Sequence, residues 1–393
     1  MTLKILNGLR VVEIAGIGPG PFCAMHLADL GADVIKIEDT GAGDYARTLG
    51  VPDGTIAPVF LAINRNKRGM RLDLKQPEGV QVFLELARTA HVVVEGFRPG
   101  VVDRLGIGYR AVQAVNPAIV YCAISGYGQT GPYRHLAGHD LNYCSYAGFT
   151  DQVGEAGGPP TIPNFQVADI LGGAVIPAMG ILAALFDAQR TGQGRFVDVA
   201  MTEGVLAHNV QALSAVALQG KVRPRGADLL SGREGCYNVY RTADDRYMAV
   251  GSLEMKFWEE VCDVVGRPDL ERHHWAADGD PAVAVTELRK VFATRTQAQW
   301  LKAFADRDCC VSGVRPFEEV LDDPQHAARE MFVHAPHPTA GDVLQFGPPL
   351  KLSDFSFEVE RPAPAPGEHT AEILASLGYS ADRIDALAAN RVI

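Results

Sequence analysis

The chain has 393 residues, 47% of them apolar and 21% charged, an ordinary composition for a globular protein with room for two or three domains. Its formal net charge of −11 argues against nucleic acid and anionic membranes as main partners, so a phosphate-bearing ligand would need a local basic patch. The seven cysteines are odd in number and form no CxxC pair, which predicts reduced thiols in a cytoplasmic protein and gives no zinc signature. The first residues, MTLKILNGLRVVEIAG, show no secretory pattern.

The first half of the chain alternates strand and helix signals. Residues 9–16, LRVVEIAG, predict a buried strand, residues 17–31 a glycine-proline turn and a helix that ends at Gly31, and residues 32–38 a second strand. This βαβ unit implies a parallel sheet with a right-handed crossover. The α/β pattern continues with a helix at 77–90, a strand at 91–97, short helices within 98–106 and 109–116, strands at 117–128 and 194–201, and a helix from 202 to about 218.

A long apolar run, ILGGAVIPAMGILAALF, occupies residues 170–186. It reaches only the lower limit of length for a membrane span, and glycines and a proline interrupt it. Because Asp169 and Asp187 flank the run, we expect a buried core helix and no membrane partner.

The composition changes after residue 220. A basic, glycine-rich stretch at 220–235 leads to residues 236–252, which predict a β-hairpin around the turn ADD. Helices are expected at 255–266, around 283–294 and at 298–305. These elements predict a smaller α+β domain over 225–325, after a large domain over 1–220. Proline-rich stretches then lead to two short helices in a C-terminal segment over 330–393.

The turn GIGPGP at residues 16–21 lies where a dinucleotide-binding fold carries GxGxxG. Its glycines are at 16, 18 and 20, and Pro19 and Pro21 intrude, so the motif does not match. A tight structural turn and a ligand-contacting loop both stay open, and we expect no nicotinamide cofactor.

The stretch NRNKRGMRLDLK, residues 64–75, concentrates basic side chains in an acidic protein: Arg65, Lys67, Arg68, Arg71 and Lys75. It is either a solvated face or a phosphate dock. Arg98 and Arg104 follow the next predicted strand, where ligands of parallel α/β folds bind, and this placement favours the dock.

Two polar stretches carry candidate reactive groups. LAGHDLNY at 136–143 contains His139, and FQVADILGG at 165–173 places Asp169 directly before the apolar run. Taken alone, His139 fits a structural histidine, and Asp169 fits a helix cap that the helix dipole holds ionised. Glu254, at the end of a strand of the smaller domain, fits a surface acid. The absence of a GxSxG elbow argues against a serine hydrolase.

Together these motifs resemble the class III CoA-transferase (CaiB/BaiF) family, which includes formyl-CoA transferase, carnitine CoA-transferase and α-methylacyl-CoA racemase. The resemblance rests on GPFCAMHLADLGADVIKIE, NRNKRGMRLDLKQPEG, VVVEGFRPGVVDRLGIGY, SGYGQTGPYRHLAGHDLNY and PNFQVADILGG, and extends from LNGLRVVEIAG to ILASLGYSADRI. It implies an α/β fold in which a Rossmann-like large domain with a parallel sheet combines the N-terminal half and the C-terminal segment. A smaller α+β domain lies between them, and two chains form an interlocked homodimer.

Within the family, AGHDLNY is similar to the racemase motif that carries the catalytic histidine. The resemblance therefore implies His139 and Asp169 as catalytic residues, with Glu254 supporting the histidine. It also implies residues that bind the CoA part of the substrate: Gly18, Pro19, Arg65, Lys67, Arg68, Leu72, Lys75, Gly96, Phe97, Arg98, Arg104, Asp140 and Tyr143. Many members have an arginine just after the second strand, where this chain has Asp39. No metal and no further cofactor is implied, because coenzyme A enters as part of the substrate.

Three functions are consistent with this resemblance. The first, which we expect, is a racemase that inverts the α-carbon of 2-methylacyl-CoA thioesters by proton transfer between His139 and Asp169. The second is a CoA transferase, in which Asp169 attacks an acyl-CoA and then holds CoA as an aspartyl thioester. The third is a non-catalytic acyl-CoA-binding protein, which would keep the basic residues and not need the His139–Asp169 pair.

Overall fold

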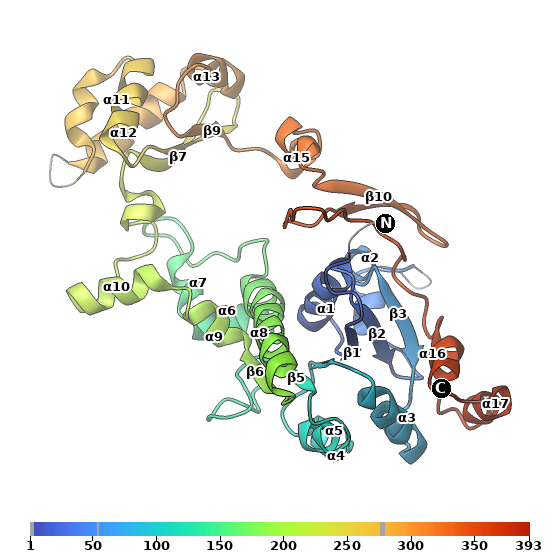
Figure 1. Ribbon diagram of the computed structural model, residues 1–393. Helices are drawn as coiled ribbons and strands as arrows, with labels where there is room; N and C mark the ends of the chain where they lie inside the picture. Colours follow the sequence, from blue (N-terminus) through green and yellow to red (C-terminus); the bar gives the residue numbers. More distant parts are fainter. Residues whose placement is uncertain (1–3, 53–54, 276–279) are drawn as a thin grey trace. The chain divides into compact units, whose positions relative to one another are not determined.

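The computed structural model describes residues 4–52, 55–275 and 280–393 (Figure 1). Two compact units make up this part of the chain. The first comprises residues up to Ala147, Asn164–His208 and Gln325–Ile393, and the second comprises Gly148–Pro163 and Asn209–Pro324. Residues 148–163 and 209–220, which the sequence analysis assigned to the large domain, thus belong to the second unit, and residues 330–393 belong to the first.

The first unit is built on a six-stranded parallel sheet with the order β3-β2-β1-β4-β5-β6. The strands are β1 (Arg10–Ile14), β2 (Asp33–Glu38), β3 (Lys67–Arg71), β4 (Val92–Glu95), β5 (Val120–Ser125) and β6 (Phe196–Ala200). Val12 lies opposite Ile35 on β2 and Val93 on β4. The predicted parallel α/β sheet is confirmed, and its strand order is that of doubly wound nucleotide-binding folds.

Helices connect the strands of this sheet, as parallel pairs require. α1 (Pro19–Asp29) joins β1 to β2, and α3 (Pro77–Arg88) joins β3 to β4. A proline opens each of them, where its missing N–H is not needed. Other helices of the first unit are α2 (Pro58–Ile63), α4 (Val101–Arg104), α5 (Tyr109–Val115), α6 (Asp140–Tyr146), α8 (Ile176–Thr191), α9 (Met201–Leu206), α16 (Thr370–Ser376) and α17 (Ala381–Ala389).

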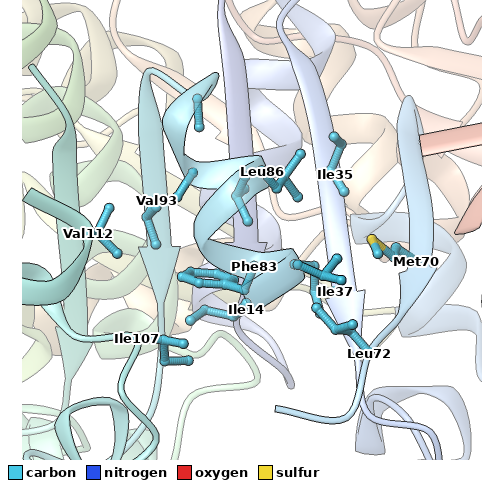
Figure 2. Packing of buried hydrophobic residues seen from close by; sticks show 14 of the residues in the cluster. Ile14, Ile35, Ile37, Met70, Leu72, Phe83, Leu86, Val93, Ile107 and Val112 are labelled. Carbon is cyan, nitrogen blue, oxygen red and sulfur yellow. The ribbon is translucent and has the colours of Figure 1, made fainter. Parts of the chain in front are cut away.

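The core of the first unit lies between the sheet and α3. Figure 2 shows Phe83 and Leu86 of α3 against side chains of the strands, among them Ile14, Ile35 and Val93. The C-terminal helices belong to the same cluster, since Ile373 and Leu374 of α16 and Leu387 of α17 are buried in it. The C-terminal segment therefore completes the core of the first unit.

Four charged side chains are buried at strands β1, β2 and β3 and the loop that follows β2. The Lys36 ammonium lies 2.8 Å from Glu13 Oε1 and 2.8 Å from Asp44 Oδ2, and the Lys67 ammonium lies 2.7 Å from Glu13 Oε2. Burial lowers the pKa of Lys67 to about 8 although Glu13 opposes it, whereas Glu13 and Asp44 more than offset burial at Lys36 and raise its pKa. We call Glu13, Lys36, Lys67 and Asp44 the buried quartet.

The apolar run forms a π-helical segment, η2 (Ala168–Val175), that continues directly into α8. Within the described residues, this one helix is long and apolar enough to cross a membrane, judged by length and composition alone. It packs against α1, α9, β5 and β6 of the same unit, where Ile181 and Leu185 are buried. The expected burial holds for one face only, since Met179 and Phe186 are exposed.

The second unit contains the predicted hairpin, formed by β7 (Tyr237–Arg241) and β8 (Tyr247–Gly251), and β9 (Val311–Gly313) pairs with β8. Its helices include α7 (Phe149–Gln152), α10 (Val210–Gln219), α11 (Met255–Val264), α12 (Pro281–Phe292) and α13 (Gln297–Phe304). α11, α12 and α13 pack around buried aromatic side chains such as Trp258 and Trp300. The predicted helix from 202 to about 218 is two helices, α9 and α10, on either side of residues 207–209.

The chain returns to the first unit through α14 (Phe317–Val320) and α15 (Pro324–Ala328). It then forms an antiparallel pair, β10 (Phe332–His337) and β11 (Gly341–Phe346), which the sequence analysis did not predict. Pro336 lies within β10, and proline is tolerated in a strand only where its N–H is not needed. The sequence pattern therefore did not indicate a strand here.

The buried quartet predicts a large loss of stability when one charge is removed. Lys36→Met should lower the free energy of unfolding by about 3–5 kcal/mol, because it leaves the carboxylates of Glu13 and Asp44 short of a cation in the core. Urea denaturation followed by circular dichroism measures the change.

Lys4→Met is the matched control, since Lys4 lies 2.6 Å from Glu360 in an ion pair that is 40% exposed on each side. It should change the free energy of unfolding by no more than about 1 kcal/mol. Equal effects of the two substitutions would contradict a structural role for the quartet.

Candidate active site

Two adjoining cavities open at the carboxyl ends of the strands, where parallel α/β folds bind ligands. Cavity A, of about 640 Å³, lies beside the ends of β1, β2 and β3. Cavity B, of about 510 Å³, lies beside β4, β5 and the start of η2. The residues that line both are Gly16, Ile17, Gly96 and Phe97. The turns after β1 and β4 therefore form a wall that the two cavities share.

Three acidic side chains hold the loops of these cavities by accepting hydrogen bonds from backbone N–H groups. Asp44 accepts from Ile17 at 2.8 Å, and Glu95 accepts from Phe97 at 2.7 Å. Ile17 adopts a left-handed backbone conformation, with φ of 58°, which the bond to Asp44 helps to hold. The turns that join cavities A and B are therefore fixed from within the protein.

The third carboxylate is Asp140, at the start of α6. Its Oδ1 accepts from the backbone N–H groups of Ala168 at 2.7 Å and Asp169 at 3.1 Å. Asp140 thus binds the N-terminal end of η2, which leaves the side chain of Asp169 available to the cavity. This corrects the interpretation of Asp169 as the helix cap, and it gives Asp140, expected to contact CoA, a structural role.

His139 and Asp169 line the same cavity, B, although 30 positions of sequence separate them. His139 precedes α6 and is exposed, and its backbone N–H donates to the Asn142 side chain at 3.1 Å. Asp169 is partly buried in the first turn of η2. The structure therefore brings together the two residues expected to be catalytic.

The Asp169 carboxyl has a pKa raised to about 6, first because of burial and then because of the neighbouring charge of Asp140, while His139 lowers it. The sequence analysis expected the helix dipole to hold Asp169 ionised. Burial is the larger effect here, because a carboxylate loses more hydration than a partial dipole charge returns. Near neutral pH this carboxyl can both lose and gain a proton.

Small residues let the elements around Asp169 approach closely. A Cβ on Gly204 of α9 would lie 2.4 Å from the Cα of Gly172, and a Cβ on Gly173 would lie 2.4 Å from Pro19 Cβ. Side chains at these positions would push η2 away from α9 and from the turn at Pro19. Gly18 of that turn lies beside the carboxylate, since a Cβ there would be 3.9 Å from Asp169 Oδ2.

Further side chains of cavity B lie on the loop after β5 and on α6. Tyr143 is buried and its hydroxyl donates to the carbonyl of Gly138, while burial and the nearby charge of Asp169 raise the pKa of its phenol to about 12. The sequence analysis missed Tyr127 and Asn142, which also line the cavity. The glycine-rich loop after a predicted strand was the signal that could have found Tyr127.

The residues expected to bind CoA fall into separate groups. Leu72, Lys75, Gly96 and Phe97 line cavity A, as does Asp39, whose carboxylate accepts from the N–H groups of Gly41 and Gly43. Pro19, Arg98 and Tyr143 line cavity B, again with Gly96 and Phe97. Arg104 is exposed at the end of α4, outside the residues that line the two cavities.

The basic cluster at 65–68 is not a phosphate dock. Arg65 pairs with Asp29 at 2.7 Å, Lys67 with Glu13, and Arg68 with Asp33 at 2.7 Å and Glu372 at 3.0 Å. These cations are buried beside carboxylates of the protein, which leaves no charge to offer a ligand. The expectation for Arg65, Lys67 and Arg68 is corrected: they anchor β3 and its neighbours.

Glu254 lies in the second unit, where it is exposed and directly precedes α11. The residues that line cavity B belong to the first unit. His139 and Asp169 thus share one cavity within the first unit. The supporting role of Glu254 stays an expectation from sequence resemblance.

Comparisons with known proteins agree on one family. The sequence profile of CoA-transferase family III matches residues 6–370. The human α-methylacyl-CoA racemase is 36% identical over 388 residues, which cover 99% of this chain and 97% of that protein. The formyl-CoA:oxalate CoA-transferase of Rhodopseudomonas palustris is 33% identical, with 96% of this chain and 94% of that protein covered. The crystal structure of a CaiB/BaiF family protein from Brucella suis matches with a TM-score of 0.83 and 30% identity, covering 95% of this chain and 99% of that one.

Asp140 raises the pKa of Asp169, so neutralising Asp140 should lower it. In Asp140→Asn the amide oxygen can still accept the two backbone N–H groups, so the loop should keep its place while the charge disappears. We expect a pKa of Asp169 below about 6, measured by ¹³C NMR titration of labelled aspartate carboxyls and assigned by difference from Asp169→Asn. Asp187→Asn serves as the control, and an unchanged or higher pKa in Asp140→Asn would show that Asp140 does not act on Asp169 by its charge.

Proposed function

We propose that this chain, which belongs to CoA-transferase family III, inverts the α-carbon of 2-methylacyl-CoA thioesters by two-base proton transfer. The observation that carries the proposal is the shared cavity of His139 and Asp169, which reach it from different elements. The likeness to α-methylacyl-CoA racemases from human and mouse, at 36% and 34% identity, supports it.

The proposed reaction needs two groups that titrate near neutral pH. The thioester carbonyl acidifies the neighbouring C–H bond, one base removes the proton from one face, and a conjugate acid returns a proton to the other. A carboxyl with a pKa of about 6 is suited to both tasks, because neither its ionised nor its neutral form is far from pH 7 in free energy. His139 supplies an imidazole, a group that commonly acts as general acid or base.

The enolate oxygen formed in this step needs a fixed donor, and one such donor contributes roughly 3–4 kcal/mol. The N–H groups of Ala168 and Asp169 at the start of η2 are already bonded to Asp140. Ile170 donates to the carbonyl of Gln166. The N–H groups of Ile17 and Phe97 are likewise bonded, to Asp44 and Glu95. We therefore assign the enolate donor to the other backbone N–H groups of the turns after β1 and β4 that line cavity B, those of Gly16, Gly96 and Arg98.

We propose that cavity A takes the CoA part of the substrate and cavity B the acyl part. The support is their common wall, formed by the turns after β1 and β4, across which a thioester can extend. Lys75 in cavity A offers positive charge for the phosphate groups of CoA, and Arg98 in cavity B offers it to the thioester end of the substrate. For Glu254 we propose support of the charge on His139, on the strength of the resemblance to racemases alone.

We also propose that the active protein is a homodimer. Met179 and Phe186 on α8 are 61% and 64% exposed, and Leu213 and Leu218 on α10 are exposed as well. Large apolar side chains exposed along one helix, on α8 and separately on α10, are typical of an interface, and a second copy of the chain is the expected partner.

The second candidate function is a CoA transferase in which Asp169 is the nucleophile. The specific observation in its favour is the number of transferases among the relatives, including a succinyl-CoA:glutarate CoA-transferase from mouse at 31% identity. That chemistry requires Asp169 and does not require His139, so variants of His139 separate the two candidates.

The racemase proposal predicts deuterium incorporation at the α-carbon when the protein is incubated with 2-methylacyl-CoA in D₂O without an acceptor acid. His139→Ala and Asp169→Asn should each reduce inversion of the α-carbon, followed by chiral chromatography of the released acid, about 10²–10⁴-fold, because inversion needs both proton carriers. Mass spectrometry of the thioester measures the exchange, and calorimetry should show thioester binding largely retained.

His334→Ala, which removes an exposed histidine from β10, is the control and should exchange like the wild type. Full inversion of the α-carbon by His139→Ala would contradict the two-base scheme. Hydroxylamine treatment with acyl-CoA, followed by peptide mass analysis, completes the test. A racemase leaves Asp169 unmodified, whereas a trapped hydroxamate at Asp169 would establish the transferase.

The placement of CoA predicts a contrast between two basic residues. Lys75→Gln should weaken CoA binding about two- to fivefold, and more at low ionic strength, because an exposed cation next to phosphate is screened by salt. Arg68→Gln should leave CoA affinity unchanged in the folded protein, since its guanidinium is bonded to Asp33 and Glu372. Calorimetric titration with CoA at two salt concentrations measures both, and a larger effect of Arg68→Gln would place the phosphates elsewhere.

A further inference from the structure

A third cavity in the first unit, cavity C, has a volume of about 540 Å³ and lies beside cavity B. Pro99 and Arg134 line both. None of the groups that carry the proposed proton transfer lines cavity C. It is therefore an additional space next to the acyl part of the site.

One wall of cavity C is aromatic. The rings of Tyr109 and Phe196 have centroids 5.2 Å apart, and Tyr121 lies 6.1 Å from Phe196. Tyr121 is fully buried and its hydroxyl donates to the carbonyl of Ile107, so the ring cannot turn away from the cavity. This wall offers rigid apolar surface to the body of a ligand.

Cavity C also contains a buried donor that lacks an acceptor. The side-chain nitrogen of Gln129 is buried, and among the residues that the structure describes it has no hydrogen-bond partner. The backbone N–H of Gln129 donates to the Asp198 carboxylate, which holds the residue in place. An unsatisfied buried donor is unfavourable, and a ligand oxygen in the cavity would satisfy it.

Glu95 supplies a second polar group, only 2% exposed at the end of β4. Burial raises the pKa of its carboxyl to about 8, the bond from Phe97 opposes this, and the charges of Asp103 and Asp198 add to it. Near pH 7 Glu95 is therefore mostly neutral, and it can donate its proton to a ligand oxygen without repelling a negative charge.

The mouth of cavity C carries Arg110, Arg134 and His135, all exposed, together with Asp103. The edge thus carries two arginines and a histidine beside one aspartate, while the Gln129 amide and neutral Glu95 can each donate inside the cavity. An apolar wall beside several donors fits a ligand that joins a hydrocarbon body to a group rich in acceptors, and a carboxylate is the simplest such group.

We propose that cavity C binds a carboxylate carried on an apolar body. Two sources have this chemistry: the far end of the acyl group of the thioester itself, and a separate carboxylic acid. The first source rests on the proposed function, since it requires an acyl chain that leaves cavity B past Pro99 and Arg134. It would make Gln129 a residue that determines specificity for acyl groups with a terminal carboxylate.

The test uses Gln129→Leu, which removes the donor and keeps the volume. Calorimetry compares 2-methyloctanoyl-CoA with the matching thioester that ends in a carboxylate, and octanoate with octanedioate as free acids. We expect Gln129→Leu to weaken binding of the carboxylate-ended thioester about tenfold or more and to leave 2-methyloctanoyl-CoA within twofold. Gln81→Leu, at an exposed glutamine of α3, should match the wild type.

Arg110→Gln, on the exposed surface of α5, gives a second measurement that does not depend on a buried substitution. It should weaken the carboxylate-ended thioester selectively, and more at low salt. If only free octanedioate responds to the two substitutions, the site binds a separate acid, and the proposed chemistry stands with that source. Equal loss for both thioesters, or no loss for any carboxylate-ended ligand, would overturn the proposal.

These binding measurements are independent of turnover. Failure of α-deuterium exchange together with selective loss in Gln129→Leu would reject the racemase and keep cavity C. α-Deuterium exchange without any selective loss in Gln129→Leu would keep the racemase and reject the proposal for cavity C.

Discussion

The structure of the site depends on the buried quartet of Glu13, Lys36, Lys67 and Asp44. Glu13 lies on β1, Lys36 on β2 and Lys67 on β3, so their ion pairs form only when the three strands are in register. Each charge would be costly in the core if one partner were missing. Asp44 joins this assembly to the turn at Ile17, and in this way a structural requirement of the sheet fixes a loop of the cavities.

Acidic side chains hold the other loops of the cavities in the same way. Glu95 holds the turn at Phe97, and Asp140 holds the start of η2. Each carboxylate satisfies backbone N–H groups that would otherwise compete for the reactive side chains or for the substrate. The Asp169 side chain holds no loop in this way within the described residues. Burial together with the charge of Asp140 raises its pKa. Aspartates and glutamates thus fix the positions of the loops around the site.

The sequence predicted elements whose side chains follow apolar periodicity, and it failed where polar groups build the interior. β1, α1 and β2 were expected because most of their buried positions are apolar, although Glu13 and Lys36 lie buried among them. β3 was missed because Lys67 and Arg68 look like surface charges, and only the tertiary fold brings Glu13 and Asp33 to them. The pairing of His139 with Asp169 came from resemblance to a family, since no local pattern reveals a shared cavity. The roles of Asp140 and Glu95 needed backbone positions that a sequence does not contain.

The acidity of Asp169 does not by itself separate a proton carrier from a nucleophile. With a pKa of about 6 it is ionised roughly ten to one at pH 7, which suits attack on a thioester as well as removal of a proton. The two chemistries differ in what they require on the other side of the substrate. A transferase needs room there for an incoming acid, whereas a racemase needs a second titrating group within reach of the same carbon. His139 lines the same cavity as Asp169. The presence of this second candidate acid–base group, more than the tuning of the carboxyl, supports the proposal of proton transfer.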